Sequence, residues 1–415
     1  MADTGRRLVA VGLAMALATA CSATQTGAPR VASSPTTSAV PAAPVASVAA
    51  PGPTGTSQGF AAPAPLPPGA TWTAVRWVPL DPASPLALLR AVVPWSGGYL
   101  GLGSAPGAPY FTSTWTSPDG VRWTAAERFA SATILGAAVV PAGLVVLAWG
   151  PDGSSVPLRT WTSRDGAAWV SHAGPDIGMP FDARNVDGTR VLLAAGSAGL
   201  LVVTSPAAAG TSDAFLSGDG TSWTPLPAGS LPAGFVGVAA SGSARGYTLV
   251  GNRGSPLTSE RAVVVTSGDG RHWTAQSLPA PEFAPTLYRA ATLLVGSSGM
   301  LVVGASVTLP SSETWWRASD GRPWQLISGF DPLPVASGGA GYGPLGAVAG
   351  DGTRLVAIST PARAWVSFDA QVWTPLAFGR DGPRLPDQPA VVVLPFGIRV
   401  LARDGTPWLG EASAR

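Results

Sequence analysis

The sequence predicts an all-β protein: a seven-bladed β-propeller with four-stranded antiparallel blades, in which the N-terminal strand closes the last blade. Two observations predict this fold. A seven-residue motif centred on Asp-Gly recurs about every 50 residues, a period typical of propeller blades. Charged residues make up only 12% of the 415 residues, against about 25% in an average soluble chain, while 52 Gly and 42 Pro supply turns. Long charged surface helices are therefore not expected.

The first 20 residues have the composition of an export signal peptide. Arg6 and Arg7 precede an apolar stretch of 13 residues, which is too short to span a membrane. The residues Leu17-Ala18-Thr19-Ala20 before Cys21 resemble the bacterial lipobox, although the leucine lies one position earlier than usual. This resemblance implies a lipoprotein anchored to the cell membrane and exposed outside the cytoplasm, with Cys21 as the lipidation site. Ordinary secretion is the alternative, and both the general and the twin-arginine export routes stay open.

Residues 21–70 are predicted to be a disordered tether. They are rich in Ala, Pro, Ser, Thr and Gly, and Arg30 is their only charged residue. A segment with so few large apolar side chains cannot bury enough surface to offset its ordering entropy. A flexible coil of this length reaches roughly 40 Å. We therefore expect the folded domain, residues 71–415, to stand away from the membrane surface.

The recurring motif, which we call the clasp, reads Ser-x-Asp-Gly-x-x-Trp. Each copy suits a tight turn, because Asp side chains accept turn N–H groups and Gly adopts positive φ without strain. In the last copy Ala370 replaces this Gly, and we expect it to be strained by roughly 1 kcal/mol. The fifth copy begins with Ala318 instead of Ser and is the weakest match. The Asp and Trp residues of the six copies are Asp119 and Trp123, Asp165 and Trp169, Asp219 and Trp223, Asp269 and Trp273, Asp320 and Trp324, and Asp369 and Trp373.

Each clasp is expected to join the third and fourth strands of one blade. With the hairpin centred on Asp119, residues 118–120 form the loop, and Trp115 faces Trp123 across the two strands. Facing aromatic pairs of this kind contribute roughly 0.2–1 kcal/mol each. The clasp is therefore interpreted as a structural element and not as a catalytic one.

Two apolar segments separated by a glycine turn precede the clasps and are predicted to be the inner strands. Residues 191–195 and 200–203 show this layout, and residues 293–295 and 300–303 repeat it. The uncharged stretch 132–150 is divided by Pro141-Ala142-Gly143 into two strand-length pieces, each expected to be buried on both faces. Each complete unit therefore has four strands.

The chain ends predict how the ring closes. Residues 390–394, 398–401 and 407–409 look like three strands of a seventh blade, after which the chain stops. Residues 69–73 repeat the Gly-x-x-Trp-Thr pattern of the clasps and supply the missing fourth strand. This closure brings Trp72 close to Trp408 and leaves no open sheet edge.

The clasp copies resemble the Asp-box, or BNR, repeat of sialidase-like propellers, over residues 70–415. In that family one residue usually separates the Asp from the Gly, whereas here they adjoin. The resemblance implies that the clasps lie on the face opposite the binding site. Because the family includes sialidases, sortilin-type receptors, xyloglucan hydrolases and photosystem assembly factors, it implies a fold and not a chemistry.

Two classes of function stay open. The first is a non-catalytic binding or scaffold module for an envelope protein or a glycan. Its candidate ligand-binding residues are expected to lie in the long connections between blades: Tyr288, Arg289, Tyr342, Arg380, Arg384 and Arg184.

The alternative is a sialidase-like or other glycoside hydrolase that uses the centre of the propeller. A sialidase-like site would need three arginines, for which the chain offers Arg184, Arg289 and Arg384, with Tyr288 and Glu282 nearby in sequence, but it lacks an Arg-Ile-Pro segment. A glycosidase with two carboxylates could use a pair from Asp176, Asp182, Glu260, Glu282, Asp331 and Asp381. We interpret these six as solvated loop charges.

The charge, the histidines and the motifs of the sequence argue against several other classes of function. A net charge of +2 without a basic stripe gives no support for a nucleic-acid partner. His172 and His272 are the only histidines and lie in different predicted blades, and no cluster has zinc-ligand spacing. No glycine-rich phosphate loop is present. We expect no metal, no cofactor and a monomeric chain.

Overall fold

The structure is a computed structural model, and it describes residues 70–103, 111, 113–126, 133–149, 158–177, 189–206, 212–253, 261–280, 288–306, 313–319, 322–327, 345–350, 353–359, 363–376, 378, 382–386, 391–394 and 396–414. All of them belong to the second of two compact units of the chain, Gly55–Arg415. The predicted export signal, the lipidation site Cys21 and the predicted tether up to residue 69 lie outside these residues, whereas Ala70 is described and belongs to a strand.

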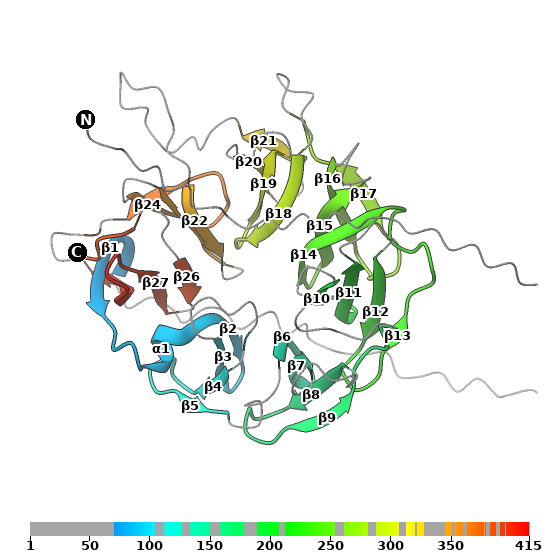
Figure 1. Ribbon diagram of the computed structural model, residues 1–415, viewed down its shortest axis with the longest axis horizontal. Coiled ribbons are helices and arrows are strands. Elements are labelled where there is room, and N and C mark those ends of the chain that lie inside the picture. Colours follow the sequence, from blue (N-terminus) through cyan, green and yellow to red (C-terminus); the bar gives the residue numbers. More distant parts are fainter. Residues whose placement is uncertain are drawn as a thin grey trace, which may run out of the picture. The chain divides into compact units, whose positions relative to one another are not determined.

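The described strands form a seven-bladed propeller (Figure 1). Each blade is a four-stranded antiparallel sheet whose strands follow in chain order, except for the seventh. Blades 1 to 3 comprise β2 (Leu89–Trp95), β3 (Gly98–Gly103), β4 (Ser113–Ser117) and β5 (Thr124–Ala125); β6 (Thr133–Val140), β7 (Gly143–Trp149), β8 (Arg159–Ser163) and β9 (Val170–Ala173); and β10 (Thr189–Gly196), β11 (Gly199–Pro206), β12 (Asp213–Ser217) and β13 (Thr224–Pro225).

The remaining blades repeat this layout. Blades 4 to 6 comprise β14 (Phe235–Ser243), β15 (Gly246–Arg253), β16 (Arg261–Ser267) and β17 (Thr274–Ser277); β18 (Tyr288–Val295), β19 (Gly299–Ser306), β20 (Glu313–Ser319) and β21 (Gln325–Ile327); and β22 (Leu345–Gly350), β23 (Leu355–Ser359), β24 (Arg363–Ser367) and β25 (Thr374–Leu376). Blade 7 comprises β26 (Val391–Leu394), β27 (Gly397–Leu401), β28 (Pro407–Ala414) and β1 (Ala70–Pro79). The four-residue helix α1 (Pro85–Leu88) follows β1, and no helix among the described residues is long and apolar enough to cross a membrane.

The ring is closed by the first described strand, as the sequence predicts. Strand β1 pairs with β28 from Ala70, opposite Ala414, to Pro79, opposite Trp408. The closing strand is therefore longer than the five residues expected from its clasp-like pattern. Trp72 is 5% exposed and packs in one apolar cluster with Trp408. Each innermost strand lies against the innermost strand of the next blade, and β26 lies against β2.

A buried arginine reinforces this closure. Arg354, which precedes β23, is 3% exposed, and its guanidinium lies 4.6 Å from the centre of the Trp72 ring. The same guanidinium donates to the carbonyl oxygen of Leu394 at the end of β26. A buried cation needs such compensation, and the ring face and carbonyl dipole provide it. Arg354 thus links blade 6 to both the innermost and the outermost strand of blade 7.

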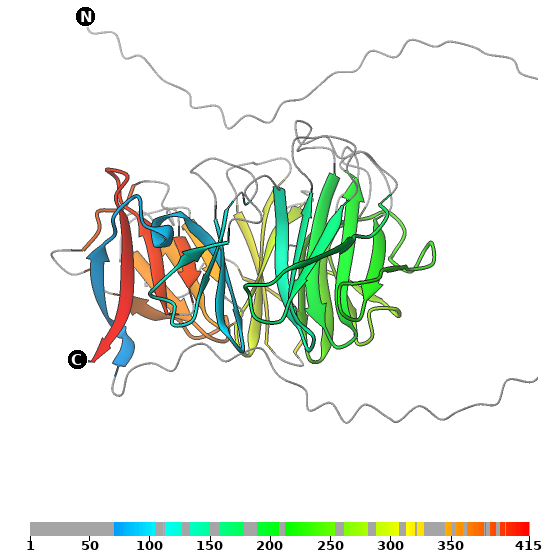
Figure 2. The same ribbon diagram turned by 90° about the horizontal axis from the view of Figure 1, so that it is seen from below.

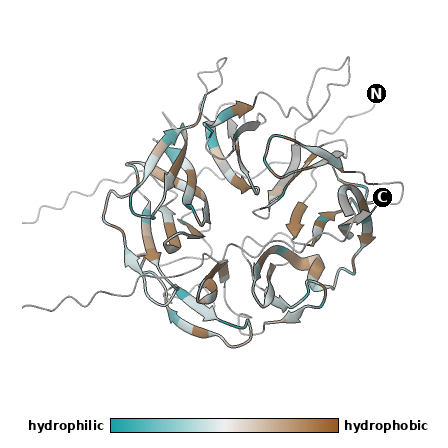
Figure 3. Cartoon of the chain, turned by 180° about the vertical axis from the view of Figure 1, so that it is seen from behind, coloured by the Kyte–Doolittle hydropathy of each residue, from teal (hydrophilic) through white to brown (hydrophobic). Residues whose placement is uncertain are grey.

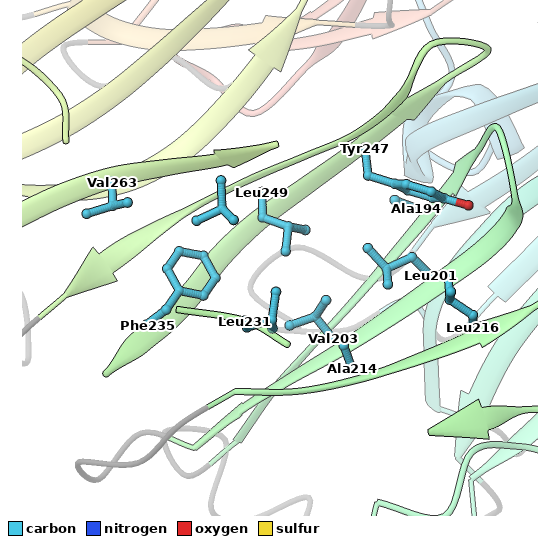
Figure 4. Close-up of a cluster of buried hydrophobic side chains, with 11 residues drawn as sticks. Ala194, Leu201, Val203, Ala214, Leu216, Leu231, Phe235, Tyr247, Leu249 and Val263 are labelled. Atoms are coloured by element: carbon cyan, nitrogen blue, oxygen red, sulfur yellow. The ribbon is translucent and has the colours of Figure 1, made fainter. Parts of the chain in front are cut away.

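The apolar core lies between neighbouring blades. In the cluster between blades 3 and 4, Leu201 and Val203 of β11 face Leu249 and Phe235 of blade 4 (Figure 4). Apolar stretches lie along strands around the whole ring (Figure 3). Second strands are buried on both faces because a blade packs on each side, and β7 shows this pattern. The prediction that residues 132–140 are also buried on both faces was wrong: β6 is half-buried, since it is an innermost strand.

The clasps join the third and fourth strands of blades, as predicted, but the predicted hairpin register was wrong. Trp115 lies opposite Ala125, two residues beyond Trp123. The same offset recurs in the other copies, which pair Trp161 with Ser171, Phe215 with Pro225, Val265 with Ala275, Trp316 with Leu326, and Trp365 with Pro375.

The wider turn follows from the hydrogen bonds of the clasp carboxylate. Asp119 Oδ1 accepts the N–H groups of both Val121 and Arg122 at 2.8 Å, so these residues stay in the turn instead of the strand. The expected face-to-face pair of Trp115 and Trp123 therefore does not form. Instead, Trp123 Nε1 donates to the carbonyl oxygen of Gly120 at 2.9 Å, and its ring lies 6.2 Å from that of Phe396 in blade 7.

The expected backbone conformations of the clasps are present. The clasp glycines of the first four copies have φ between 71° and 83°, and Ala370 has φ 59° in the sixth. Ala370 is the only residue other than glycine with positive φ among the described residues. In the fifth copy Asp320 lies outside the described residues, whereas Trp324 is buried.

Candidate functional site

The ring has two faces that differ in the connections they carry. We call the face with the turns between third and fourth strands the clasp face, and the opposite one the entry face. Because neighbouring strands are antiparallel, the turns between first and second strands also lie on the clasp face, and each innermost strand begins at the entry face. Seen from the side, the strands run from one face to the other (Figure 2). The long connections between blades therefore lie on the entry face.

Three arginines occupy the same place at the entry-face end of alternate innermost strands. We call Arg90, Arg190 and Arg289 the inner arginines: each is the second residue of its strand, in blades 1, 3 and 5. The seven innermost strands contain no Asp or Glu and no other charged residue. The entry-face end of these strands is therefore cationic.

Arg289 is held in place by blade 4. Its neighbour Tyr288 pairs with Arg261 in a parallel bridge that joins β16 to β18. The backbone of Ala290, on the other side, is bound by the side-chain amide of Asn252 in β15. Arg289 itself is half-buried. These contacts fix the start of β18 and with it the backbone position of Arg289.

Arg90 lies in a β-bulge next to a second arginine. The register of β2 shifts between Leu89 and Ala91, which leaves Arg90 as the bulged residue. Arg399 of β27 lies nearby: burial, and then the charge of Arg90, lower the pKa of Arg399 to about 10. Arg399 also donates to the carbonyl oxygen of Ala87 in α1. Two like charges thus stand at the junction of blades 7 and 1, which adds to the positive potential there.

Arg190 is the most accessible of the inner arginines. It is exposed and lies opposite Ser205 in a regular, unbulged pair of strands. A guanidinium presents several N–H donors in one plane, which suits a carboxylate or a phosphate group. The arrangement is therefore equipped to attract and bind an anionic group.

The residues predicted for ligand binding are only partly brought to this place. Arg289 belongs to the inner arginines, and Tyr288 begins the same strand, so the prediction that these two residues lie in a connection between blades was wrong. Arg384 is exposed, and its carbonyl oxygen accepts the N–H of Arg403 at 2.7 Å. Arg184, Tyr342 and Arg380 lie outside the described residues.

Of the six carboxylates considered for a glycoside hydrolase, the structure describes one. Asp176 is described and exposed. Asp182, Glu260, Glu282, Asp331 and Asp381 lie outside the described part of the chain.

The two histidines contact different partners in different blades. His172 Nε2 lies 3.0 Å from Thr162 Oγ1 in blade 2, and His272 Nδ1 lies 2.7 Å from Asp269 Oδ2 in blade 4. Within the described ranges, no three His, Cys, Asp or Glu residues are grouped as a metal site.

Sequence reasoning missed Arg90 and Arg190 because it searched the long connections and not the strands. A signal was present: each lies 33 positions before its clasp tryptophan, Trp123 or Trp223. Aligning the repeats on their tryptophans would have placed both arginines at one position of the blade.

Comparison with known proteins finds similarity among solved structures only. No protein-family model and no curated protein matches the chain. The WD40 domain of Pan2 from Neurospora crassa is 8% identical, with a TM-score of 0.46 over 83% of this chain and 97% of that one. YCF48, solved with a D1 peptide, is 13% identical, with a TM-score of 0.41 over 68% and 79% of the two chains. A glycosyl hydrolase from Bacteroides ovatus is 15% identical, with a TM-score of 0.29 over 62% and 94%. None of these similarities bears on function.

Proposed function

We propose that this chain is a membrane-anchored, extracytoplasmic lipoprotein of the Asp-box type whose propeller binds a partner and catalyses no reaction. The observation that carries the binding role is the position of the inner arginines. They stand at equivalent places on three of the seven innermost strands. None of the seven innermost strands contains a carboxylate side chain. A glycosidase of the usual kind needs two carboxyl groups on either side of the bond it cleaves. Three guanidinium groups instead favour recognition of negative charge.

The partner is proposed to carry an anionic group, as an acidic segment of an envelope protein or an acidic glycan does. Arg–carboxylate and Arg–phosphate contacts are specific in direction and weaken when salt screens the charges. The lipid on Cys21 and the segment 21–70 would hold the propeller near such partners at the cell surface. This part of the proposal depends on the lipobox resemblance and on the composition of the tether.

Binding is tested with the full chain, by capture from an envelope extract and by a glycan array. We expect Arg190→Gln to weaken retention of the partner by at least about tenfold, since 1.4 kcal/mol corresponds to that factor. The matched control is Arg164→Gln, which removes an exposed arginine from the clasp of blade 2, on the opposite face, and should leave retention unchanged. Equal retention by both variants would contradict the binding role of the inner arginines. Release of free sugar from a retained glycan would favour the hydrolase alternative.

Anchoring is tested separately. Cys21→Ser should abolish incorporation of labelled fatty acid and move the protein from the membrane fraction to the soluble fraction. Labelled protein that keeps its lipid after this substitution would contradict the assignment of Cys21. Neither result depends on what the propeller binds.

A further inference from the structure

Blade 4 carries a polar hollow on the clasp face, away from the inner arginines. Its volume is about 340 Å³, at the lower end of the range found for small-ligand sites. The described residues that line it belong to blade 4, among them Arg245, Tyr247, Thr248, Thr266, His272 and Thr274.

A row of threonine hydroxyls crosses this hollow. Thr248 of β15 lies opposite Thr266 of β16, which lies opposite Thr274 of β17. Directly opposed residues share one face of a sheet, so all three side chains lie on the same side of the blade. Thr266 and Thr274 are exposed, and Thr248 is half-buried.

The corresponding position in the other clasp-bearing blades is apolar and buried. Where β15 has Thr248, blades 1, 2, 3, 5 and 6 have Leu100, Val145, Leu201, Leu301 and Val356, none of them more than 1% exposed. A polar and half-exposed residue at a position that is otherwise core departs from the pattern of the fold. Such departures are expected at functional sites.

The clasp that follows blade 4 in the chain departs from the others in sequence. The clasp of each blade packs on the blade before it: Gly220 of blade 3 lies against Val145 of blade 2, and Gly270 of blade 4 lies against Leu216 of blade 3. The clasp that follows blade 4 in the chain is the fifth, in which Ala318 replaces the serine. In the first clasp that serine hydroxyl accepts the Gly120 N–H at 2.8 Å. The weakest clasp thus follows the blade whose face is polar.

The arginine, histidine and threonine side chains that line the hollow can donate hydrogen bonds. Arg245 is exposed at the turn between β14 and β15, and His272 is held over the opposite rim by Asp269. The Asp269 carboxylate also accepts the N–H groups of Arg271 and His272 and the hydroxyl of Ser267, so its acceptor capacity is occupied. Tyr247 is 2% exposed and offers no ring face for a sugar.

We propose that this hollow binds an oxyanion of the phosphate class, with the Arg245 guanidinium and the hydroxyls of Thr248, Thr266 and Thr274 as donors. Arginine and hydroxyl donors together recognise tetrahedral oxyanions through charge-assisted hydrogen bonds. The anion has two sources: free inorganic phosphate, or a phosphate ester of a surface polymer. The site lies on the face opposite the inner arginines and is independent of the proposed function.

The test is calorimetric titration of the full chain with inorganic phosphate and, separately, with glucose 1-phosphate. We expect saturable binding, weakened at least about tenfold by Arg245→Gln and abolished by Thr248→Leu. Leucine at position 248 restores the residue found in blades 1, 3 and 5, so this variant should unfold at the same temperature as the parent. Tighter binding of glucose 1-phosphate would identify an ester as the source, and tighter binding of phosphate would identify the free anion.

Matched controls make the result specific to blade 4. Arg164→Gln removes an exposed arginine from the clasp of blade 2, and Thr116→Val removes the hydroxyl that corresponds to Thr266 in blade 1. Both should bind phosphate within about twofold of the parent. Absence of saturable binding by the parent, or equal weakening in the Arg164 and Arg245 variants, would overturn the proposal.

Discussion

The side-chain amide of Asn252 in blade 4 binds both backbone groups of Ala290 in blade 5. Asn252 Oδ1 accepts the Ala290 N–H at 2.8 Å, and Nδ2 donates to the Ala290 carbonyl at 3.3 Å. These bonds satisfy backbone groups of the innermost strand β18 directly before its bulge, which lies between Ala290 and Thr292. Blade 3 holds blade 4 in a related way, since Ser205 accepts the Gly237 N–H at 2.9 Å and Ser212 donates to the Phe235 carbonyl at 2.9 Å. Polar side chains of one blade thus fix where the next innermost strand begins.

Asn252→Ala should therefore destabilise the propeller. The substitution leaves the N–H of Ala290, a residue only 3% exposed, without its acceptor, which typically costs about 1–3 kcal/mol. Urea unfolding of the variant and the parent measures this difference. The matched control is Gln276→Ala, which removes an exposed amide from β17 of the same blade and should change the free energy of unfolding by less than about 0.5 kcal/mol. Equal stabilities of the Asn252 variant and the parent would show that the two bonds contribute nothing.

Much of the fold could be predicted because its determinants are local and repeated. Aspartate and glycine at fixed positions specify the clasp turn, and a fixed period specifies the blade. The register of the hairpin could not be derived in this way, because two bonds from the carboxylate of Asp119 keep Val121 and Arg122 in the turn. A three-residue loop and this longer turn contain the same kinds of residue. Only the hydrogen bonds distinguish them.

The candidate site was harder to predict, because the repeated fold and not sequence proximity relates its residues, which occupy equivalent positions of three blades. Arg90 and Arg289 are far apart along the chain, and each lies within an apolar strand, where sequence analysis looks for core residues. The hollow of blade 4 was also missed, since Thr248 looks like an ordinary strand threonine until it is compared with Leu100 and Leu201 at the same place in other blades.

Removing the closing strand should open the ring. A chain that begins at residue 80 lacks Trp72 and exposes apolar residues of blades 6 and 7, among them Ile358 and Val400. Trp72→Ala alone should cost about 3–5 kcal/mol, as large aromatic truncations in cores do. We expect the shortened chain to aggregate or to lose its cooperative unfolding transition in calorimetry. A chain that begins at residue 60 retains β1 and should unfold at the temperature of the full-length protein. Cooperative unfolding of both chains at one temperature would contradict closure by β1.

The clasp glycines should tolerate alanine poorly. Gly270 has φ 73°, and a Cβ atom there would lie 2.9 Å from Leu216 Cδ2. Gly270→Ala combines backbone strain with this close contact and should destabilise the protein by about 1–3 kcal/mol.

The reverse substitution, Ala370→Gly, should be nearly neutral. Relief of about 1 kcal/mol of strain is offset by the greater entropy of glycine in the unfolded chain and by the loss of a buried methyl group. Thermal unfolding of the two variants checks both predictions. A large gain in stability from Ala370→Gly would mean that strain outweighs packing in the sixth clasp.

The clasp carboxylates should make the propeller sensitive to acid. Backbone N–H groups of Arg122 and Val121 hold the pKa of Asp119 below its usual value, and Asp165, Asp219 and Asp269 share this effect through their own turn N–H groups. A pKa that is lower in the folded than in the unfolded state contributes stability above the unfolded value of about 3.9. That contribution disappears as the pH falls through the folded pKa values. The unfolding temperature should therefore be nearly constant from about pH 7 to pH 5 and fall below about pH 4.

Neutral amides in the clasps separate this effect from general acid denaturation. Asp119→Asn keeps an acceptor oxygen but no longer titrates, so the fall in unfolding temperature below about pH 4 should become shallower. Adding Asp165→Asn should reduce the slope by a further step, because the two clasps lie in different blades and share no hydrogen-bond partner. If the double variant keeps the slope of the parent, the acid sensitivity does not come from the clasps.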